Sequence, residues 1–130
     1  MEGTTPMDDL PAAFGHYLDM WNERDADRVR SHLDAAVSED MLFVDPRDQH
    51  VGRDALHQNV RRFRRAFPDA DLSIRSGIDG HNNRYRYEWR IAVGDVVVLD
   101  GFDVATVNDD GQIERVDGFF GPLPEKRTSD

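Results

Sequence analysis

Apolar residues recur every three or four positions in the first half of the chain, which is the spacing of amphipathic helices. The first such segment places five residues on one face: Leu10, Phe14, Tyr17, Leu18 and Trp21. Asp8 and Asp9 are suitable N-caps for this helix, and Pro11 suits its first turn. A second, short helix is expected after Asp25, with Val29 and Leu33 facing inward.

A third helix is predicted from Arg53 to Ala66, and Pro68 follows it as a stop signal. Its inward stripe consists of Leu56, Val60, Phe63 and Phe67. Between the second and third helices, residues 41–45 indicate a brief strand. This strand should end at Pro46, because proline cannot donate to a ladder. A polar loop, 46–52, completes the connection.

The second half of the chain is typical of β-structure. Strands are expected at residues 71–78, 83–92, 96–107 and 112–120. The turn signals between them are Asp79-Gly80, Gly94-Asp95 and Asp109-Asp110-Gly111. Helices followed by an antiparallel meander predict an α+β fold, with the helices on one face of a curved, mainly antiparallel sheet. We expect residues 1–130 to form a single domain with loose ends at 1–7 and 122–130.

The charge of the chain argues against two classes of partner. The chain carries 26 acidic and 16 basic residues, for a net charge of -10, and Lys126 is its only lysine. Such a field disfavours nucleic acid and anionic membranes. Residues 1–10 lack the pattern of a secretory signal, and no apolar run approaches the length of a membrane span. A cytoplasmic protein is therefore expected.

Motifs for metals and cofactors are lacking. The chain has no cysteine, and its five histidines show neither an HExxH motif nor paired spacing. It also has no P-loop, no GxSxG and no dinucleotide fingerprint. We therefore expect no metal and no cofactor.

Three ionisable residues occupy positions where the pattern calls for apolar ones. Tyr17 lies on the apolar stripe of the first helix, Asp45 ends the first strand, and Asp103 interrupts an apolar strand. Burying such groups without partners costs several kcal/mol, so together they predict a pocket with acid–base chemistry. Structural interpretations stay open for each. The Tyr17 hydroxyl can reach water, Asp45 can cap the following turn, and Asp103 can pair with Arg86.

Several motifs together resemble the NTF2-like superfamily, which includes the SnoaL-like and ketosteroid isomerase-like proteins. They are the runs His16–Asp25, Phe43–Pro46, Gly52–Leu56, Gly101–Val104, Asp110–Ile113 and Phe119-Phe120. The resemblance covers about residues 8–121. It implies a cone-shaped α+β barrel that encloses one small-molecule pocket, and a homodimer formed through the outer face of the sheet.

Within the superfamily, the motifs are most similar to ketosteroid isomerase. The resemblance implies that Asp45 is a general base that moves a proton next to a carbonyl group. It also implies that Tyr17 and Asp103 form the oxyanion hole. An enzyme of this kind is an isomerase or a lyase. The expected substrate contacts are Trp21, Val60, Arg86, Glu88 and Phe120.

The role of Asp103 depends on the register across Gly94-Asp95. A two-residue turn places Arg86 opposite Asp103, whereas a three-residue turn places Tyr85 there. The sequence does not settle this register. For the pleat, we favour the arrangement in which Arg86 and Glu88 point into the cavity and the alternating aromatic residues point outward. The reverse arrangement, with the aromatic residues in the core, stays open.

Other functions stay open as well. Arg86 and Glu88 resemble the Arg-x-acid motif of limonene epoxide hydrolase, although the expected third carboxylate is replaced by Gly118. A cyclase of the SnoaL mechanism is disfavoured, because its aspartate corresponds to about Gly121. The alternative from another class is a non-catalytic ligand-binding module that uses the same cavity.

Overall fold

The computed structural model describes residues 10–128, which form three helices and seven strands. The helices are α1 (Ala13–Asn22), α2 (Ala26–Ala36) and α3 (Arg53–Ala66). The strands are β1 (Val37–Val44), β2 (Gln49–Val51), β3 (Asp71–Ile74), β4 (Asp79–His81), β5 (Arg84–Val93), β6 (Val96–Val107) and β7 (Ile113–Phe120). Within this part of the chain, no helix combines the length and hydrophobicity needed to cross a membrane.

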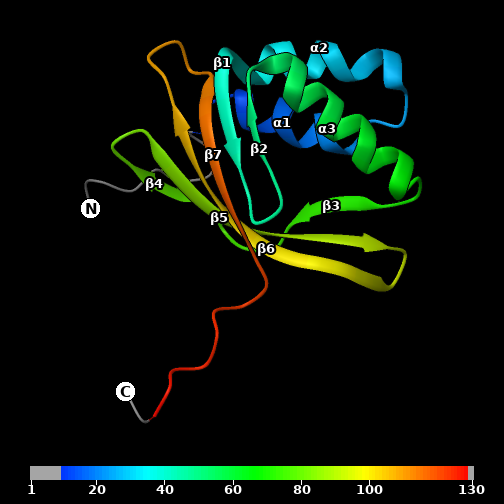
Figure 1. Cartoon of the computed structure of the whole chain (residues 1–130). Coiled ribbons are helices and arrows are strands. Elements are labelled where there is room, and N and C mark those ends of the chain that lie inside the picture. The colour runs from blue at the N-terminus through cyan, green and yellow to red at the C-terminus, as the bar shows by residue number, and fades with distance from the viewer. Residues whose placement is uncertain (1–9, 129–130) are drawn as a thin grey trace.

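The strands form one curved sheet with the helices on one of its faces (Figure 1). The strand order is β2-β1-β7-β6-β5-β3, and β4 pairs with β5 beside this path. Strands β1 and β7 are parallel, whereas the other pairs are antiparallel. The predicted α+β fold with a mainly antiparallel sheet is confirmed. The sheet stays open, because β2 and β3 are its two edges.

The helices largely follow their predicted bounds. Helix α2 begins after Asp25, whose side chain accepts a hydrogen bond from the Asp27 amide, and α3 runs from Arg53 to Ala66 as predicted. Helix α1 begins at Ala13 and has no side-chain cap. The expected caps Asp8 and Asp9, like the expected loose end at 1–7, lie outside the described residues.

Two short strands differ from the prediction. Strand β2 pairs with β1 within the segment that was expected to be a loop. Residues Asp79-Gly80 belong to β4 rather than to a turn, so that prediction was wrong. The chain instead reverses at Asn82 and Asn83, whose φ angles are 48° and 64°. Asparagine tolerates this left-handed conformation better than most residues, which explains why the turn forms three residues later.

The core lies between the helices and the inner face of the sheet. Its largest fully buried side chains are Met20, Leu33, Met41, Leu56, Ile113, Val37, Val60 and Val116. These come from all three helices and from β1 and β7. Polar contacts tie the end of α1 to the sheet edge, because the Asn22 side chain donates to the Leu72 carbonyl and accepts from the Leu72 amide.

The register across Gly94-Asp95 differs from both predicted alternatives. The turn is a two-residue turn, since Val93 pairs with Val96. An irregularity then shifts the register between Ala92 and Ile91, so that Ile91 pairs with Leu99. Val98 is the extra residue of this β-bulge, and it moves every later pair by one position. As a result, Tyr87 lies opposite Asp103.

This one-residue shift determines which side chains face the core. Tyr87 and Trp89 are buried on the inner face, whereas Arg86 and Glu88 are exposed on the outer face. Arg86 forms an ion pair with Asp79 of β4 at 2.8 Å. The predictions that Arg86 faces Asp103 and that the charged residues point into the cavity were therefore wrong. The aromatic residues are inside because their burial is favourable and that of unpaired charges is costly.

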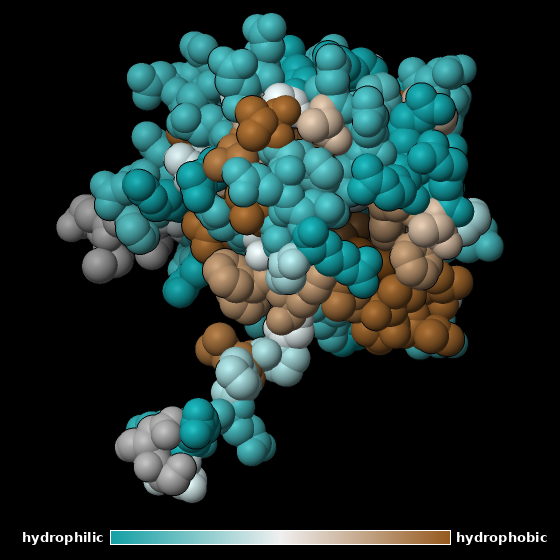
Figure 2. Space-filling view, in the orientation of Figure 1, coloured by the Kyte–Doolittle hydropathy of each residue, from teal (hydrophilic) through white to brown (hydrophobic). Residues whose placement is uncertain are grey.

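Apolar side chains also remain on the surface. Figure 2 shows a brown patch over the tip of the β5–β6 hairpin, where Val93, Val96, Val97 and Val98 are exposed. On β6 and β7, Phe102 and Phe119 stack with ring centroids 5.0 Å apart, and Phe119 is 51% exposed. The homodimer expected from the resemblance stays a prediction.

The position of Trp89 depends on a glycine opposite it. Gly101 pairs with Trp89 across the β5–β6 ladder. A Cβ atom at position 101 would collide with the Trp89 indole and with the Phe119 carbonyl oxygen. The absence of a side chain therefore lets Trp89 lie flat against β6.

Replacing Gly101 with alanine should destabilise the protein, since the added methyl group forces Trp89 or β7 to move. We expect a loss of about 1–3 kcal/mol in the free energy of unfolding, measured by urea denaturation. Gly77→Ala is the matched control, because nothing lies within 4 Å of a Cβ there. It should change stability by about 0.5 kcal/mol or less. Equal stabilities for the two variants would contradict this account.

Candidate functional site

A pocket of about 410 Å³ lies between the helices and the inner face of the sheet. Its apolar walls consist of Leu10, Phe14, Leu18, Trp21, Phe43, Phe63, Ala66, Phe67, Leu72, Ile74, Ile78, Trp89, Ile91, Leu99 and Phe120. The other lining residues are Gly15, Tyr17, Asp45, Arg47, Asp48, Asn59, Arg62, Tyr87, Asp103 and Gly118. A cavity of this size and character is typical of sites for small organic molecules.

Asp103 is the buried carboxyl group of this pocket, with 8% exposure. Its two carboxyl oxygens accept hydrogen bonds from the Tyr87 hydroxyl at 3.1 Å and from Trp89 Nε1 at 2.9 Å. Burial raises the pKa of Asp103 to about 6, although both hydrogen bonds oppose this shift because they favour the carboxylate. The group therefore exchanges its proton close to neutral pH, as an acid–base catalyst must.

Tyr17 contributes a protonated phenol to the same pocket. It lies on α1 and is 4% exposed. The structural interpretation, in which its hydroxyl reaches bulk water, was therefore wrong. Burial raises the pKa of Tyr17 well above its usual value, and the nearby charges of Asp103 and Asp45 raise it further. The hydroxyl is consequently a hydrogen-bond donor at every physiological pH.

Asp45 follows β1 and has a structural role that one of the two interpretations anticipated. Its Oδ1 accepts hydrogen bonds from the amides of Arg47 and Asp48, each at 2.9 Å, and so caps the turn after Pro46. Its Oδ2 has no hydrogen-bond partner among residues 10–128, and Asp45 lines the pocket. One oxygen can therefore serve a ligand while the other holds the turn.

Gly118 leaves room for the side chains of Asp45 and Asp103. It pairs with Asp103 across the β6–β7 ladder. A Cβ at position 118 would lie 2.9 Å from Asp103 Oδ1 and 3.4 Å from Asp45 Cβ. A side chain at position 118 would therefore crowd both aspartates. Burial is the main cause of the raised pKa of Asp103, and the charge of Asp45 adds to it.

The expected substrate contacts divide into two groups. Trp21 and Phe120 line the pocket as predicted. Val60 is 1% exposed and belongs to the hydrophobic core rather than to the pocket wall, so that prediction was wrong. Arg86 and Glu88 line a groove on the outer face of the sheet, so their assignment to the pocket was wrong too. The Arg-x-acid arrangement of an epoxide hydrolase is therefore not formed in this pocket.

Four of the lining residues that sequence reasoning missed bear on the chemistry of the site. Tyr87 and Trp89 were expected on the outer face, and only the bulge at Val98 brings them to Asp103. Arg47 and Arg62 are exposed, and they line the pocket where it meets solvent. The Arg47 guanidinium lies 5.7 Å from the centroid of the Phe120 ring. Their signal in the sequence was weak, because arginine is common along the whole chain.

Comparisons with known proteins agree with this architecture. Residues 14–116 match the model of the SnoaL-like domain family. A crystal structure of a "putative isomerase of the SnoaL-like family" from Agrobacterium tumefaciens is 32% identical, with a TM-score of 0.79. The alignment covers 85% of this chain and 96% of that one. None of the curated proteins is similar enough to count as a match.

Two more distant structures share the fold. An NTF2-like protein of unknown function from Exiguobacterium is 23% identical, with a TM-score of 0.70 over 85% of this chain and 99% of that one. A "putative polyketide cyclase" from Sinorhizobium meliloti is 16% identical, with a TM-score of 0.68 over 88% and 99% of the two chains. The cone-shaped NTF2-like fold is therefore established, with its sheet unclosed.

The raised pKa of Asp103 predicts a specific dependence of stability on pH. The unfolded chain has the ordinary value of 3.8, so between pH 4 and pH 6 the folded state binds more protons than the unfolded state. The contribution of Asp103 to stability is therefore complete below pH 4 and is lost as the pH rises through about 6. A shift of about two units corresponds to a loss of roughly 3 kcal/mol.

Asp103→Asn removes this titration while keeping the shape of the side chain. Relative to the wild type, the variant should gain up to roughly 3 kcal/mol of stability between pH 4 and pH 7, measured by urea denaturation. Asp100→Asn is a control, because Asp100 pairs with Arg90 outside the pocket and its pKa is lowered. If the free energies of unfolding of Asp103→Asn and the wild type differed by the same amount at every pH from 4 to 7, the raised pKa of Asp103 would be disproved.

Proposed function

The chain belongs to the SnoaL-like family of the NTF2-like superfamily, and from this premise we propose that its pocket is an active site for proton transfer next to a carbonyl group. The observation that carries the proposal is that Tyr17, Asp45 and Asp103 line one largely apolar pocket and lie close enough to influence one another electrostatically. An apolar site strengthens each electrostatic interaction with a substrate oxygen, since little water competes there.

In the proposed reaction, the double bond of a β,γ-unsaturated ketone moves into conjugation. The free oxygen of Asp45 takes a proton from the carbon between the carbonyl and the double bond, and the electron pair of that C–H bond forms a dienolate. Asp45 then returns the proton to the far carbon of the former double bond. Atoms and electrons balance without a cofactor, because the reaction is an isomerisation.

Tyr17 and Asp103 stabilise the dienolate oxygen in this scheme. The Tyr17 hydroxyl donates a hydrogen bond at every relevant pH, because burial keeps it protonated. Asp103 donates only when it carries a proton, which half of the free protein does near pH 6. A bound apolar ligand excludes water and raises this pKa further, so substrate favours the donor form.

Turnover should depend on Asp45 and Tyr17. We expect Asp45→Asn to lower kcat by about 10²-fold or more, because the amide cannot accept the proton. Tyr17→Phe should lower kcat by about 10²-fold, because the oxyanion loses a donor. The measurement follows the ultraviolet absorbance of the conjugated enone formed from a β,γ-unsaturated 3-ketosteroid.

Tyr85→Phe is the matched control for Tyr17→Phe, since Tyr85 packs edge-on against Phe14 and does not line the pocket. It should keep wild-type turnover. Above pH 6 the kcat/KM of the wild type should fall as Asp103 loses its proton. In Asp103→Asn this decrease should be absent, because the amide does not titrate. Absence of enone formation by the wild type at all pH values would rule out the steroid substrate.

One observation favours a second candidate function, a non-catalytic ligand-binding module. Asp45 already serves the protein by capping a turn, and that role needs no catalysis. For a binding module, Asp45→Asn would leave the affinity for a ligand nearly unchanged unless Asp45 itself holds it. For the enzyme, the same variant would bind the ligand and fail to convert it.

The solvent-facing side of the pocket supports a ligand with an apolar body and an anionic end. Arg47 and Arg62 line this side and form no ion pair with a carboxylate of residues 10–128. By contrast, Arg24, Arg30, Arg86, Arg90 and Arg115 are all paired with aspartates. In a chain of charge -10, two unpaired guanidinium groups at a pocket favour a carboxylate or a phosphate there.

Arg62→Gln should therefore weaken binding of an anionic ligand more than that of a neutral one. The probes are a steroid hemisuccinate, which is anionic, and the neutral parent steroid. We expect the affinity to fall about tenfold for the anion alone, measured by fluorescence quenching of Trp21 and Trp89. Arg61→Gln is the control, because Arg61 is exposed on the same helix and does not line the pocket. Equal losses for both probes would contradict an anion site.

A further inference from the structure

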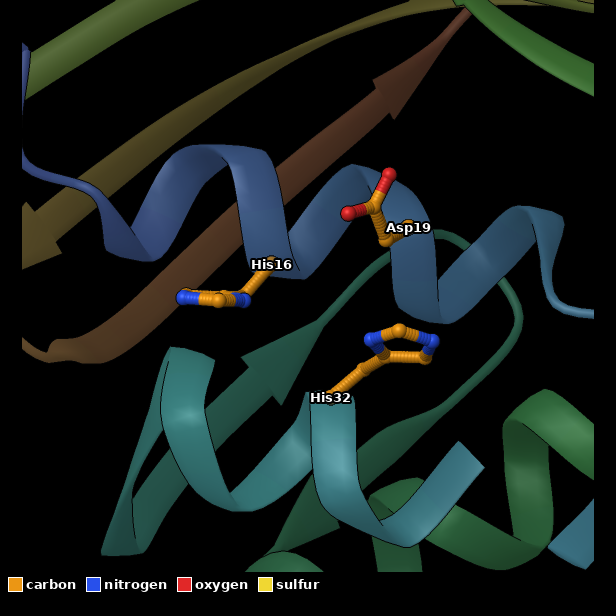
Figure 3. A group of neighbouring side chains, drawn as sticks. All are labelled: His16, Asp19 and His32. Carbon is orange, nitrogen blue, oxygen red and sulfur yellow. The ribbon is translucent and has the colours of Figure 1, made fainter. Parts of the chain in front are cut away.

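Away from the pocket, two histidines and an aspartate gather where α1 and α2 lie side by side. His16 and Asp19 come from α1, three positions apart and so on the same face of the helix, and His32 comes from α2 (Figure 3). One potential ligand atom from each residue lies within 4.8 Å of the others. None of the three lines the pocket.

These donors suit a first-row transition metal. Two imidazoles and one carboxylate are ligands that Zn²⁺, Co²⁺ and Ni²⁺ accept, with water in the open positions. Metal–ligand bonds of about 2.1 Å put tetrahedral ligand atoms roughly 3.4 Å apart. The ligand atoms need to approach one another by at most about 1.4 Å, and the exposed side chains of His16 and Asp19 are able to rotate that far.

An independent contact prepares His32 for this role. The Nε2 atom of His32 lies 2.8 Å from Oε1 of Glu23, and the pair is partly buried. Glu23 is a carboxylate that can only accept in this contact, so the Nε2 atom of His32 carries the proton. The Nδ1 lone pair of His32 is then free for a metal. A carboxylate behind the imidazole is the usual support of metal-bound histidine.

We propose that His16, Asp19 and His32 bind a divalent transition-metal ion such as Zn²⁺ and that this ion fastens α1 to α2. Helix α1 carries Tyr17 on its buried side. The ion thus stabilises the wall of the pocket from outside and takes no part in the reaction. The sequence motifs did not show this site, because its ligands come from two helices that only the fold brings together.

The test is a titration of the purified protein, with any affinity tag removed, using Co²⁺ and Zn²⁺. We expect one Co²⁺ per chain, with the visible absorption of a tetrahedral or five-coordinate site, and displacement of Co²⁺ by Zn²⁺. Zn²⁺ should also raise the Tm of the wild type in a concentration-dependent manner. This test needs no turnover, so its outcome is independent of the proposed reaction.

Variants locate the bound ion. His16→Ala should weaken Zn²⁺ binding by about tenfold or more and abolish the rise in Tm, because His16 is an exposed ligand whose loss spares the core. Glu23→Gln should weaken binding by about tenfold while all three ligands remain. His81→Ala is the control, since it also removes one exposed histidine, and it should bind like the wild type.

Two results would overturn the proposal. One is a wild-type protein that binds no Co²⁺ or Zn²⁺ saturably. The other is equal affinity in His16→Ala, His81→Ala and the wild type, which would place the ion elsewhere.

Discussion

The carboxyl group of Asp103, held by Tyr87 and Trp89 inside an apolar pocket, is the interaction on which the rest of the site depends. A buried carboxylate without partners would cost several kcal/mol, and the two hydrogen bonds offset part of that cost. They can form only because β5 and β6 are paired with Tyr87 opposite Asp103. Two glycines complete the arrangement: Gly101 admits the Trp89 ring, and Gly118 leaves room for the carboxylate itself.

The balance of these contacts sets the chemistry. Burial raises the pKa of Asp103 and the donors lower it, and the result of about 6 keeps both protonation states accessible near neutrality. Burial raises the pKa of Tyr17 and Tyr87, and the charge of Asp103 raises both further, so both phenols stay protonated. Asp45 differs because two backbone amides hold one of its oxygens at the pocket rim. Four ionisable groups thus have different surroundings within one cavity.

Local patterns predicted the helices and the long strands well. Helix α3 and strand β6 have the predicted bounds, since Gly52 and Pro68 delimit the helix and Gly94-Asp95 and Asp109–Gly111 delimit the strand. The ionisable pocket residues Tyr17, Asp45 and Asp103 were also found from their sequence positions, whereas Trp21 and Phe120 were expected from the family resemblance. These successes share one cause: helical periodicity, turn residues and misplaced charges are all visible within a few neighbouring residues.

The sequence by itself therefore determined the order of the helices and long strands, the α+β fold and the main ionisable residues of the pocket. Only the tertiary structure decided what surrounds Asp103. The bulge lies in Val96-Val97-Val98, three identical residues that give no sign of which one is extra. Successive strand residues face opposite sides, so one extra residue changes the partner of Asp103 from Arg86 to Tyr87. It also places Glu88 outside the cavity instead of inside it. The choice was made by packing, because the inner face had to bury Tyr87 and Trp89 and leave the charged residues in water.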